Sequence, residues 1–169
     1  MTAIPQTQPG SDRLWGRIQS FSFEDGPASC SFWARLASEN GWSMSFAARV
    51  ITEYRRFLYL AVVAGHQVSP SDRVDQVWHL HLLYTESYWN RLCRDVLGMP
   101  LHHQPTTGGG LERAKFDDWY RKTLETYRSV FVEDPPADIW PPAISRGGGN
   151  GRYQRVNTGR CWIIRKPWR

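Results

Sequence analysis

The stretch from residue 44 to residue 64 limits the fold more than any other part of the sequence. Its apolar side chains recur at spacings of three and four residues, which is the period of one face of an α-helix. Ser43 is a good N-cap for this helix, and Gly65 is a good stop. The apolar positions are Phe46, Val50, Tyr54, Phe57, Leu58 and Ala61. Because a long amphipathic helix has to bury its apolar face, other helices are predicted to pack around it.

Three more helices are predicted from capping residues, glycine stops and apolar spacing. They cover residues 31–40, residues 71 to about 97, and residues 111–130. Gly41 and Gly98 follow the first two of these directly, and a loop with three consecutive glycines precedes the last. The predicted fold class is therefore all-α, an irregular bundle of about four helices.

The two ends of the chain differ from this helical body. Residues 1–27 are rich in Pro, Gly, Ser and Gln, and are predicted to form an extended, irregular arm with one short helix. Residues 28–145 are the predicted helical domain, whose proline-rich segment 134–142 crosses the body through Ile139 and Trp140. Residues 146–169 are predicted to form a glycine-rich linker and a basic tail with a small β-hairpin.

Basic charge is concentrated in that tail. Of the 21 Lys and Arg residues, seven lie after residue 145, where there is no acidic residue, and the preceding part carries 14 basic and 16 acidic residues. A basic tail can follow an acidic surface or phosphate groups. The predicted partners are therefore a protein or another acidic surface, and nucleic acid, although the sequence has no RNP, zinc-finger or helix-turn-helix signature. A solubilising tail is the plainer alternative.

Cysteine usage and hydropathy indicate a cytoplasmic protein. Cys30, Cys93 and Cys161 are odd in number and form no C-x-x-C pair, so neither a disulfide framework nor a cysteine zinc site is predicted. The N-terminal residues lack an apolar leader, and the most apolar stretch, residues 57–65, is too short to span a bilayer. No membrane association is expected.

Four of the five histidines lie within residues 74–103. His79 and His81 fall on the predicted third helix, where about 100° per residue makes them face directions roughly 200° apart. His79 shares its face with the acidic residues Asp75 and Glu86, whereas His81 lies in an aromatic and apolar stripe. On an unbroken helix the two histidines cannot easily hold one ion together.

A metal site is predicted to join histidines that are distant in the chain. One histidine of the third helix would be joined by the one in the preceding turn and by one from the following loop, and zinc, iron or copper would accept such a set. The candidate ligands are His66, His79, His81, His102 and His103, and the candidate catalytic or orienting carboxylates are Asp75 and Glu86. A structural hydrogen-bond network of the same side chains is the alternative. The loop at residues 105–113 has neither a Walker nor a dinucleotide pattern, so no nucleotide cofactor is predicted.

Two narrower interpretations concern single residues. Asp75 lies four residues before His79, so it could orient this histidine as a general base, or the two could form only a surface ion pair. Cys93 falls in the last turn of the predicted helix, where the helix dipole disfavours a thiolate. A cysteine nucleophile is therefore not predicted.

The string VDQVWHLHLLYTESYW, followed by HHQPTTGGGLE and PPADIWP, resembles the glycine-rich domain-containing protein-like family of bacteria, fungi and plants. Its members carry a V-D-x-x-W-H-x-H-L core, a tyrosine and then a histidine loop. The resemblance covers residues 32–142 and implies a helical domain, but no particular reaction. The matching positions are Val74, Asp75, Trp78, His79, His81, Leu82, Tyr88, His102, His103, Pro105 and Gly108.

Two hypotheses of function follow from the sequence. The first is a histidine-rich metal-binding helical domain, whose stronger form is a metal-dependent enzyme of unknown substrate. The second is a non-catalytic interaction module, in which a surface rich in the chain's nine tryptophans acts with the basic tail to bind a protein or nucleic acid.

Overall fold

The computed structural model describes residues 13–24, 31–103 and 110–143, and within these ranges the fold is all-α, as predicted. No strand occurs among the described residues. In chain order the helices are α1 (Arg13–Ser20), α2 (Phe32–Asn40), α3 (Met44–Val63), α4 (Asp72–Leu83), the π-helix η3 (Glu86–Leu97) and α5 (Gly110–Phe131).

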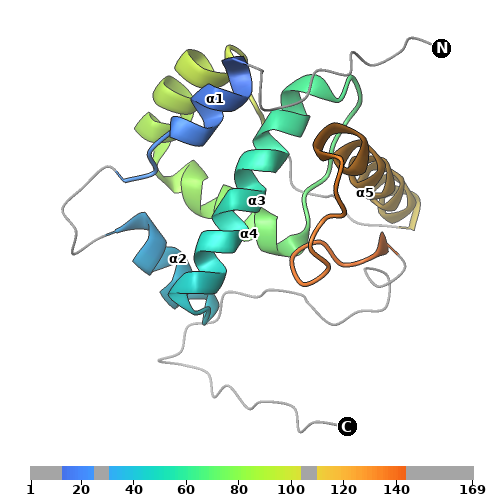
Figure 1. The fold of residues 1–169 in the computed structure, drawn as a ribbon, viewed down its shortest axis with the longest axis horizontal. Helices are drawn as coiled ribbons and strands as arrows, with labels where there is room; N and C mark the ends of the chain where they lie inside the picture. The colour runs from blue at the N-terminus through green and yellow to red at the C-terminus, as the bar shows by residue number, and fades with distance from the viewer. Residues whose placement is uncertain (1–12, 25–30, 104–109, 144–169) are drawn as a thin grey trace, which may run out of the picture.

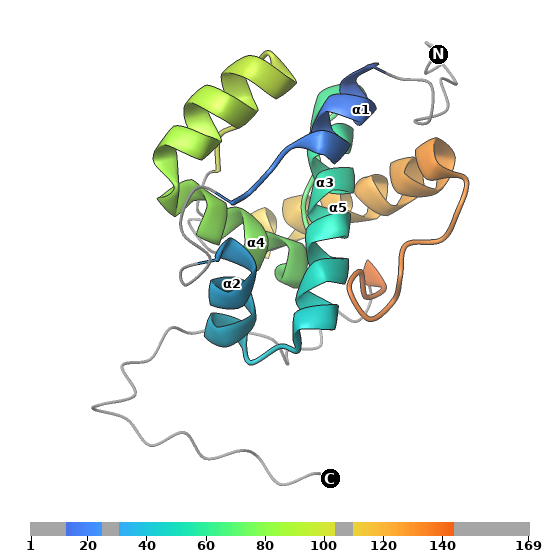
Figure 2. The ribbon, with the colours of Figure 1, turned by 60° about the vertical axis from the view of Figure 1, so that its left-hand side comes forward.

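Helix α3 is the centre of the molecule (Figures 1 and 2). It packs against α1, α2, α4 and α5, and Figure 1 shows α2 and α5 on opposite sides of it. The stripe predicted for this helix forms much of the core. Four of its members, Val50, Tyr54, Phe57 and Leu58, are completely buried, and the other two, Phe46 and Ala61, are half-buried.

The helix ends follow local sequence signals. The side chains of Ser31, Ser43 and Ser71 each accept a hydrogen bond from the backbone N–H three residues later, so α2, α3 and α4 begin where capping predicts. Gly41 and Gly98 adopt left-handed backbone conformations, with φ of 65° and 71°, directly after α2 and η3. Glycine adopts this conformation without the steric cost that a Cβ imposes.

The prediction of one continuous third helix is wrong. Helix α4 ends at Leu83, and Tyr84 leaves the helical region with φ of −92° and ψ of 66°. The chain then continues as η3, whose hydrogen bonds span five residues instead of four. A spacing of three and four residues does not distinguish these two kinds of helix. The break, together with α1 in the predicted arm, raises the number of helices among the described residues from about four to six.

The segment after α5 crosses the body as predicted. Ile139 and Trp140 are buried, and the backbone N–H groups of both bond to the Pro136 carbonyl, so the segment contains a tight turn. Arg49 of α3 donates two hydrogen bonds to Asp138, at 2.7 and 2.8 Å. Figure 1 shows this segment, in orange, returning from α5 towards α3.

Several predictions for the ends and the glycine loop fall outside the described residues. These are the first part of the N-terminal arm, the loop at 104–109, and the linker, hairpin and basic tail after residue 143. Among the helices that are described, none has the length and apolarity needed to cross a bilayer.

Candidate metal centre

Asp75, His79 and His103 form a group of potential metal ligands, called here the metal centre. One ligand atom of each residue lies within 4.8 Å of those of the other two. His103 Nε2 is 3.0 Å from Asp75 Oδ1, and His79 Nδ1 is 3.4 Å from Asp75 Oδ2. The centroids of the two imidazole rings are 4.4 Å apart. Two histidines and one carboxylate therefore meet at one place.

Helix α4 supplies two of the three residues. Asp75 and His79 are one turn apart, so their side chains leave the same face of the helix. The opposite face is anchored in the core by Val74 and Val77, which are completely buried. The helix thus holds the carboxylate and one imidazole at a fixed spacing on its outer side.

His103 reaches this face from the segment that follows η3. The Trp78 Nε1–H group donates a 2.8 Å hydrogen bond to the Tyr88 hydroxyl, which in turn donates to the Leu101 carbonyl. Burial raises the pKa of the Tyr88 hydroxyl, so it keeps the proton that it donates. The Trp78 ring also packs edge-on against His103, at 4.6 Å between centroids. These contacts fix residues 101–103 beside α4.

The side chains of the metal centre are partly exposed to solvent. The side chains of Asp75, His79 and His103 are 26, 40 and 18% exposed, so an ion and a small molecule can reach them. Zinc enzymes use three protein ligands of this kind and leave a fourth position open. Two histidines and a carboxylate also form the ligand set of many non-haem iron sites.

The structure places His81 away from this group, on the buried side of α4. Its Nδ1 lies 3.2 Å from the Tyr54 hydroxyl and its Nε2 3.2 Å from Ser87 Oγ. Burial lowers the pKa of His81 to about 3, so the ring is neutral. The opposed directions predicted for His79 and His81 are confirmed, and for His81 the structure shows a buried hydrogen-bond network.

The remaining candidate residues also lie apart from the metal centre. His66 Nε2 is 2.7 Å from Thr126 Oγ1, where the turn before α4 meets α5. His102 is exposed, and its ring lies 5.5 Å from that of Trp89. Glu86 accepts a hydrogen bond from Asn90 on η3. The break at Tyr84 interrupts the helix face that Glu86 was predicted to share with His79, which accounts for its different surroundings.

Sequence reasoning named all three residues of the metal centre, but it gave Trp78 and Tyr88 no role beyond their place in a motif. The sequence does contain an indication that Trp78 and Tyr88 form hydrogen bonds in the core. Both are large polar aromatic residues on faces that were predicted to be buried, where an indole N–H or a phenol hydroxyl needs a hydrogen-bond partner.

The fold and the metal centre together define a class, a helical protein with a two-histidine, one-carboxylate group that could hold a metal ion. Residues 18–119, more than half of the chain, match the model of the UCP032817-like family, and the protein belongs to that family. The matched range includes all three residues of the metal centre. No curated protein and no solved structure matches the chain. The resemblance to the glycine-rich domain-containing protein-like family stays a prediction.

Proposed function

We propose that Asp75, His79 and His103 bind a divalent transition-metal ion, with zinc and ferrous iron as the best-suited ions. The observation that carries this proposal is the convergence of their ligand atoms within 4.8 Å. In a tetrahedral zinc site with bonds of about 2.0–2.1 Å, neighbouring ligand atoms lie about 3.3 Å apart. The separations of 3.0 and 3.4 Å, each to a different oxygen of Asp75, are close to that value, and the upper bound of 4.8 Å on the spacing of the three ligand atoms leaves a shift of about an ångström or more for the ion to draw them together.

The stronger form of the proposal is a metal-dependent enzyme. Three protein ligands leave a coordination position on the exposed side, where a bound ion supplies Lewis acidity to a substrate oxygen. Before an ion binds, Asp75 holds both imidazoles in place, since one of its oxygens faces a nitrogen of each ring. Trp78 excludes water from one side of His103, against which its ring packs.

The proposal is tested by metal titration of protein purified without an affinity tag and stripped of metal. The wild-type protein is expected to bind about one equivalent of zinc. H79A and H103A should each weaken binding by about 100-fold or more, because each removes one of three ligands. H102A is the matched control, since it removes the neighbouring exposed imidazole, and it should bind as the wild type does.

Uptake below about a tenth of an equivalent would rule the proposal out. So would an effect of H102A equal to that of H103A, because binding would then follow the number of histidines in the loop and not the geometry of the metal centre. Circular dichroism of each variant shows whether the helices are intact.

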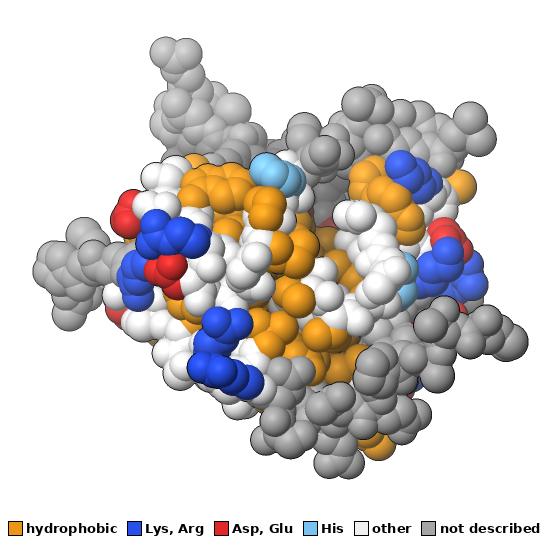
Figure 3. Space-filling model, turned by 90° about the horizontal axis from the view of Figure 1, so that it is seen from above, with side chains coloured by type: hydrophobic (Ala, Val, Ile, Leu, Met, Phe, Trp, Pro, Cys, Tyr) orange, Lys and Arg blue, Asp and Glu red, His pale blue; other side chains and the backbone are white. Residues whose placement is uncertain are grey.

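The interaction-module hypothesis has one supporting observation. Among the described tryptophans, Trp89 is the one that is exposed, at 38%, and Met99 is exposed at 40%. Figure 3 shows hydrophobic side chains gathered on the face seen from above, with a histidine at the edge of one group. The other described tryptophans are packed to a greater degree, so a broad tryptophan-rich surface has little support. Partner binding through the basic tail stays a prediction.

A further inference from the structure

A run of aromatic rings leads from the metal centre to the surface of the protein. The Trp78 ring packs edge-on against His103, with 4.6 Å between the two centroids. Trp78 Nε1 donates a 2.8 Å hydrogen bond to the Tyr88 hydroxyl. The Tyr88 ring packs edge-on against Trp89, at 5.0 Å between centroids. We call Trp78, Tyr88 and Trp89 the aromatic run, in which every step from His103 outwards is a direct contact.

The two ends of the aromatic run differ in their access to solvent. Trp78 is 6% exposed and Tyr88 is completely buried, whereas Trp89 is 38% exposed. Large aromatic side chains are usually buried to a greater extent than this. The inner end of the run therefore touches a candidate metal ligand in a dry environment, and the outer end can meet another molecule in solution.

The change from core to surface takes place within η3. Tyr88 and Trp89 are consecutive residues of this π-helix. Tyr88 turns inwards to Trp78, and Trp89 turns outwards. Segments of π-helix are rare and frequently lie at functional sites. Because the two rings are in contact, one residue step of η3 connects the buried part of the run to the surface.

The hydrogen bonds of Tyr88 keep the protons of the aromatic run in place. The Tyr88 hydroxyl donates to the Leu101 carbonyl, which is too weak a base to take up a phenol proton. Burial raises the pKa of the Tyr88 hydroxyl, which also retains the proton. A phenol that keeps its proton is hard to oxidise, but an indole can lose an electron while its N–H group stays intact. Tyr88 is therefore suited to bridge the two indoles without trapping an oxidising equivalent.

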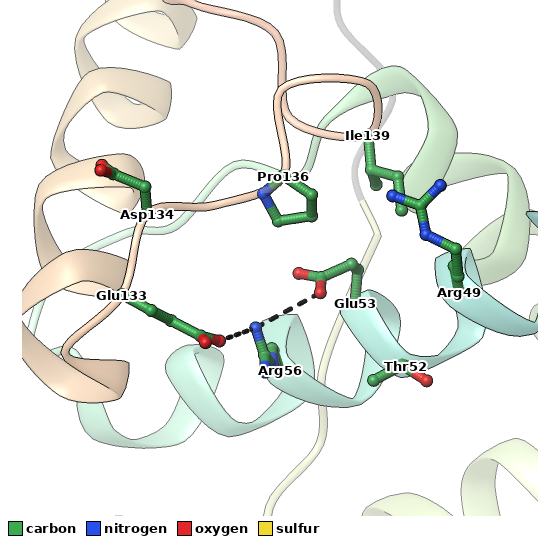
Figure 4. A pocket seen from close by; sticks show the side chains of 8 residues that line it. All are labelled: Arg49, Thr52, Glu53, Arg56, Glu133, Asp134, Pro136 and Ile139. Carbon is green, nitrogen blue, oxygen red and sulfur yellow. Dashed lines mark ion pairs between the residues drawn. The ribbon is translucent and has the colours of Figure 1, made fainter.

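A second series of aromatic contacts provides a comparison. Trp15 packs against Phe131, and Phe131 packs against Tyr127, at 5.5 and 4.9 Å between centroids. The Tyr127 hydroxyl donates to Glu53, which lines a cleft between α3 and the segment after α5 (Figure 4). There Glu53 pairs with Arg56, as Figure 4 also shows. This second series leads to an ion pair, whereas the aromatic run leads to a candidate metal ligand.

The donor set of the metal centre suits a redox-active ion. Two histidines and one carboxylate are the ligands of many non-haem iron sites, and iron changes readily between its ferrous and ferric states. Zinc has no such change. Only with iron would a path for electrons from His103 to the surface have a use.

We propose that the aromatic run carries single electrons between an iron ion held by the metal centre and an external one-electron oxidant that meets Trp89. This inference rests on the proposed function and selects iron from the two ions named there. The oxidant takes one electron from the Trp89 indole. The electron that restores Trp89 passes through Tyr88 and Trp78, and the ferrous ion becomes ferric. No bond forms or breaks, and each ring returns to its starting state.

The test compares protein loaded with ferrous iron and protein loaded with zinc, after the metal content of each has been measured and free metal removed. A laser flash on tris(bipyridine)ruthenium(II), with a cobalt(III) quencher, generates a one-electron oxidant that attacks exposed indoles. Transient absorption then follows the indole radical. In the zinc protein the radical should persist. In the iron protein a part of the signal should decay about tenfold faster or more, with formation of ferric iron.

Three variants assign that iron-dependent decay to the aromatic run. W89F removes the exposed indole, and W78F interrupts the run beside His103. Both should abolish the iron-dependent decay, because a phenyl ring is not oxidised under these conditions. W15F is the matched control, since Trp15 belongs to the second series, and it should decay as the wild type does. The iron content of each variant shows whether the metal centre is intact.

The possible failures are distinguishable. Equal radical lifetimes with iron and with zinc, in wild-type protein that holds one equivalent of iron, would overturn this inference and leave the proposed metal site standing. An absence of iron uptake would overturn both. An iron-dependent decay that is unchanged in W89F would also overturn the inference, even if W78F fails to fold.

Discussion

The Tyr88 hydroxyl offers a specific test of how the fold builds the metal centre. It accepts a hydrogen bond from Trp78 Nε1 and donates one to the Leu101 carbonyl, two residues before His103. Y88F removes this oxygen and keeps the ring. We therefore predict that the substitution lowers both the stability of the fold and the affinity for metal.

The expected loss of stability follows from the two hydrogen bonds. Trp78 is 6% exposed, so its N–H group loses its acceptor in a buried place, at a cost of about 1–3 kcal/mol. The lost bond to Leu101 adds about 1 kcal/mol. The free energy of unfolding should fall by about 2–4 kcal/mol, as measured by urea denaturation without metal. Zinc affinity should fall by about 10- to 100-fold, the usual effect of removing a group that orients a ligand.

Y127F is the matched control. Tyr127 is also completely buried, and its hydroxyl also bridges two partners, Glu53 and Arg56, but it lies on α5 away from the metal centre. It should lose a similar amount of stability and retain wild-type zinc affinity. If Y88F is as unstable as Y127F and yet binds zinc like the wild type, the Tyr88 hydroxyl does not position His103, and the reasoning is refuted.

Three further predictions concern the fold. The raised pKa of Glu53 means that the folded state holds the carboxyl proton more tightly than the unfolded state does, so the Glu53 contribution to stability should fall as pH rises from about 4.5 through the raised pKa. E53Q should remove this pH dependence of the free energy of unfolding, as measured by denaturation across pH. An identical pH dependence in both proteins would show that Glu53 is not its source. L58A should lower the free energy of unfolding by about 2–5 kcal/mol in urea denaturation, since Leu58 of α3 is completely buried in the hydrophobic core. A loss below about 1 kcal/mol would mean that α3 does not lie at the centre of this core. G98A should lower the melting temperature, because Gly98 has φ of 71°, a conformation that alanine adopts only at a cost. G16A should raise the melting temperature slightly, because Gly16 lies inside α1 and no atom is near the added Cβ. A higher melting temperature for both variants would show that η3 does not end in a left-handed residue.

Most of the fold can be predicted from local signals. The serine caps and glycine stops define the ends of α2 and α3, and the apolar stripe of α3 defines the core. The break at Tyr84 could not be predicted in this way. Buried contacts lie beside it, among them the bonds of His81 to Tyr54 and Ser87, and no local pattern reports these.

The sequence indicates that histidines and a carboxylate form the metal centre, but it does not indicate which of the histidines belong to it. Helix geometry separates His79 from His81, because their angular difference depends only on their spacing. The choice of His103 over His102 depends instead on how residues 101–103 dock on Tyr88 and Trp78, which are 13 and 23 residues earlier in the chain than Leu101. Glu53 shows a similar limit. Its position on the buried face of α3 is visible in the sequence, but its bonds to Tyr127 and Trp140 are not.

Anomalous X-ray diffraction at the zinc absorption edge, from crystals of the zinc-loaded protein, tests the metal centre most directly. We predict one strong anomalous peak at about 2.0–2.2 Å from Asp75, His79 and His103, with an open coordination position on the solvent side. A peak bound instead by His66 or His102, or no peak at Asp75 in protein that has taken up zinc, would contradict the metal centre described here.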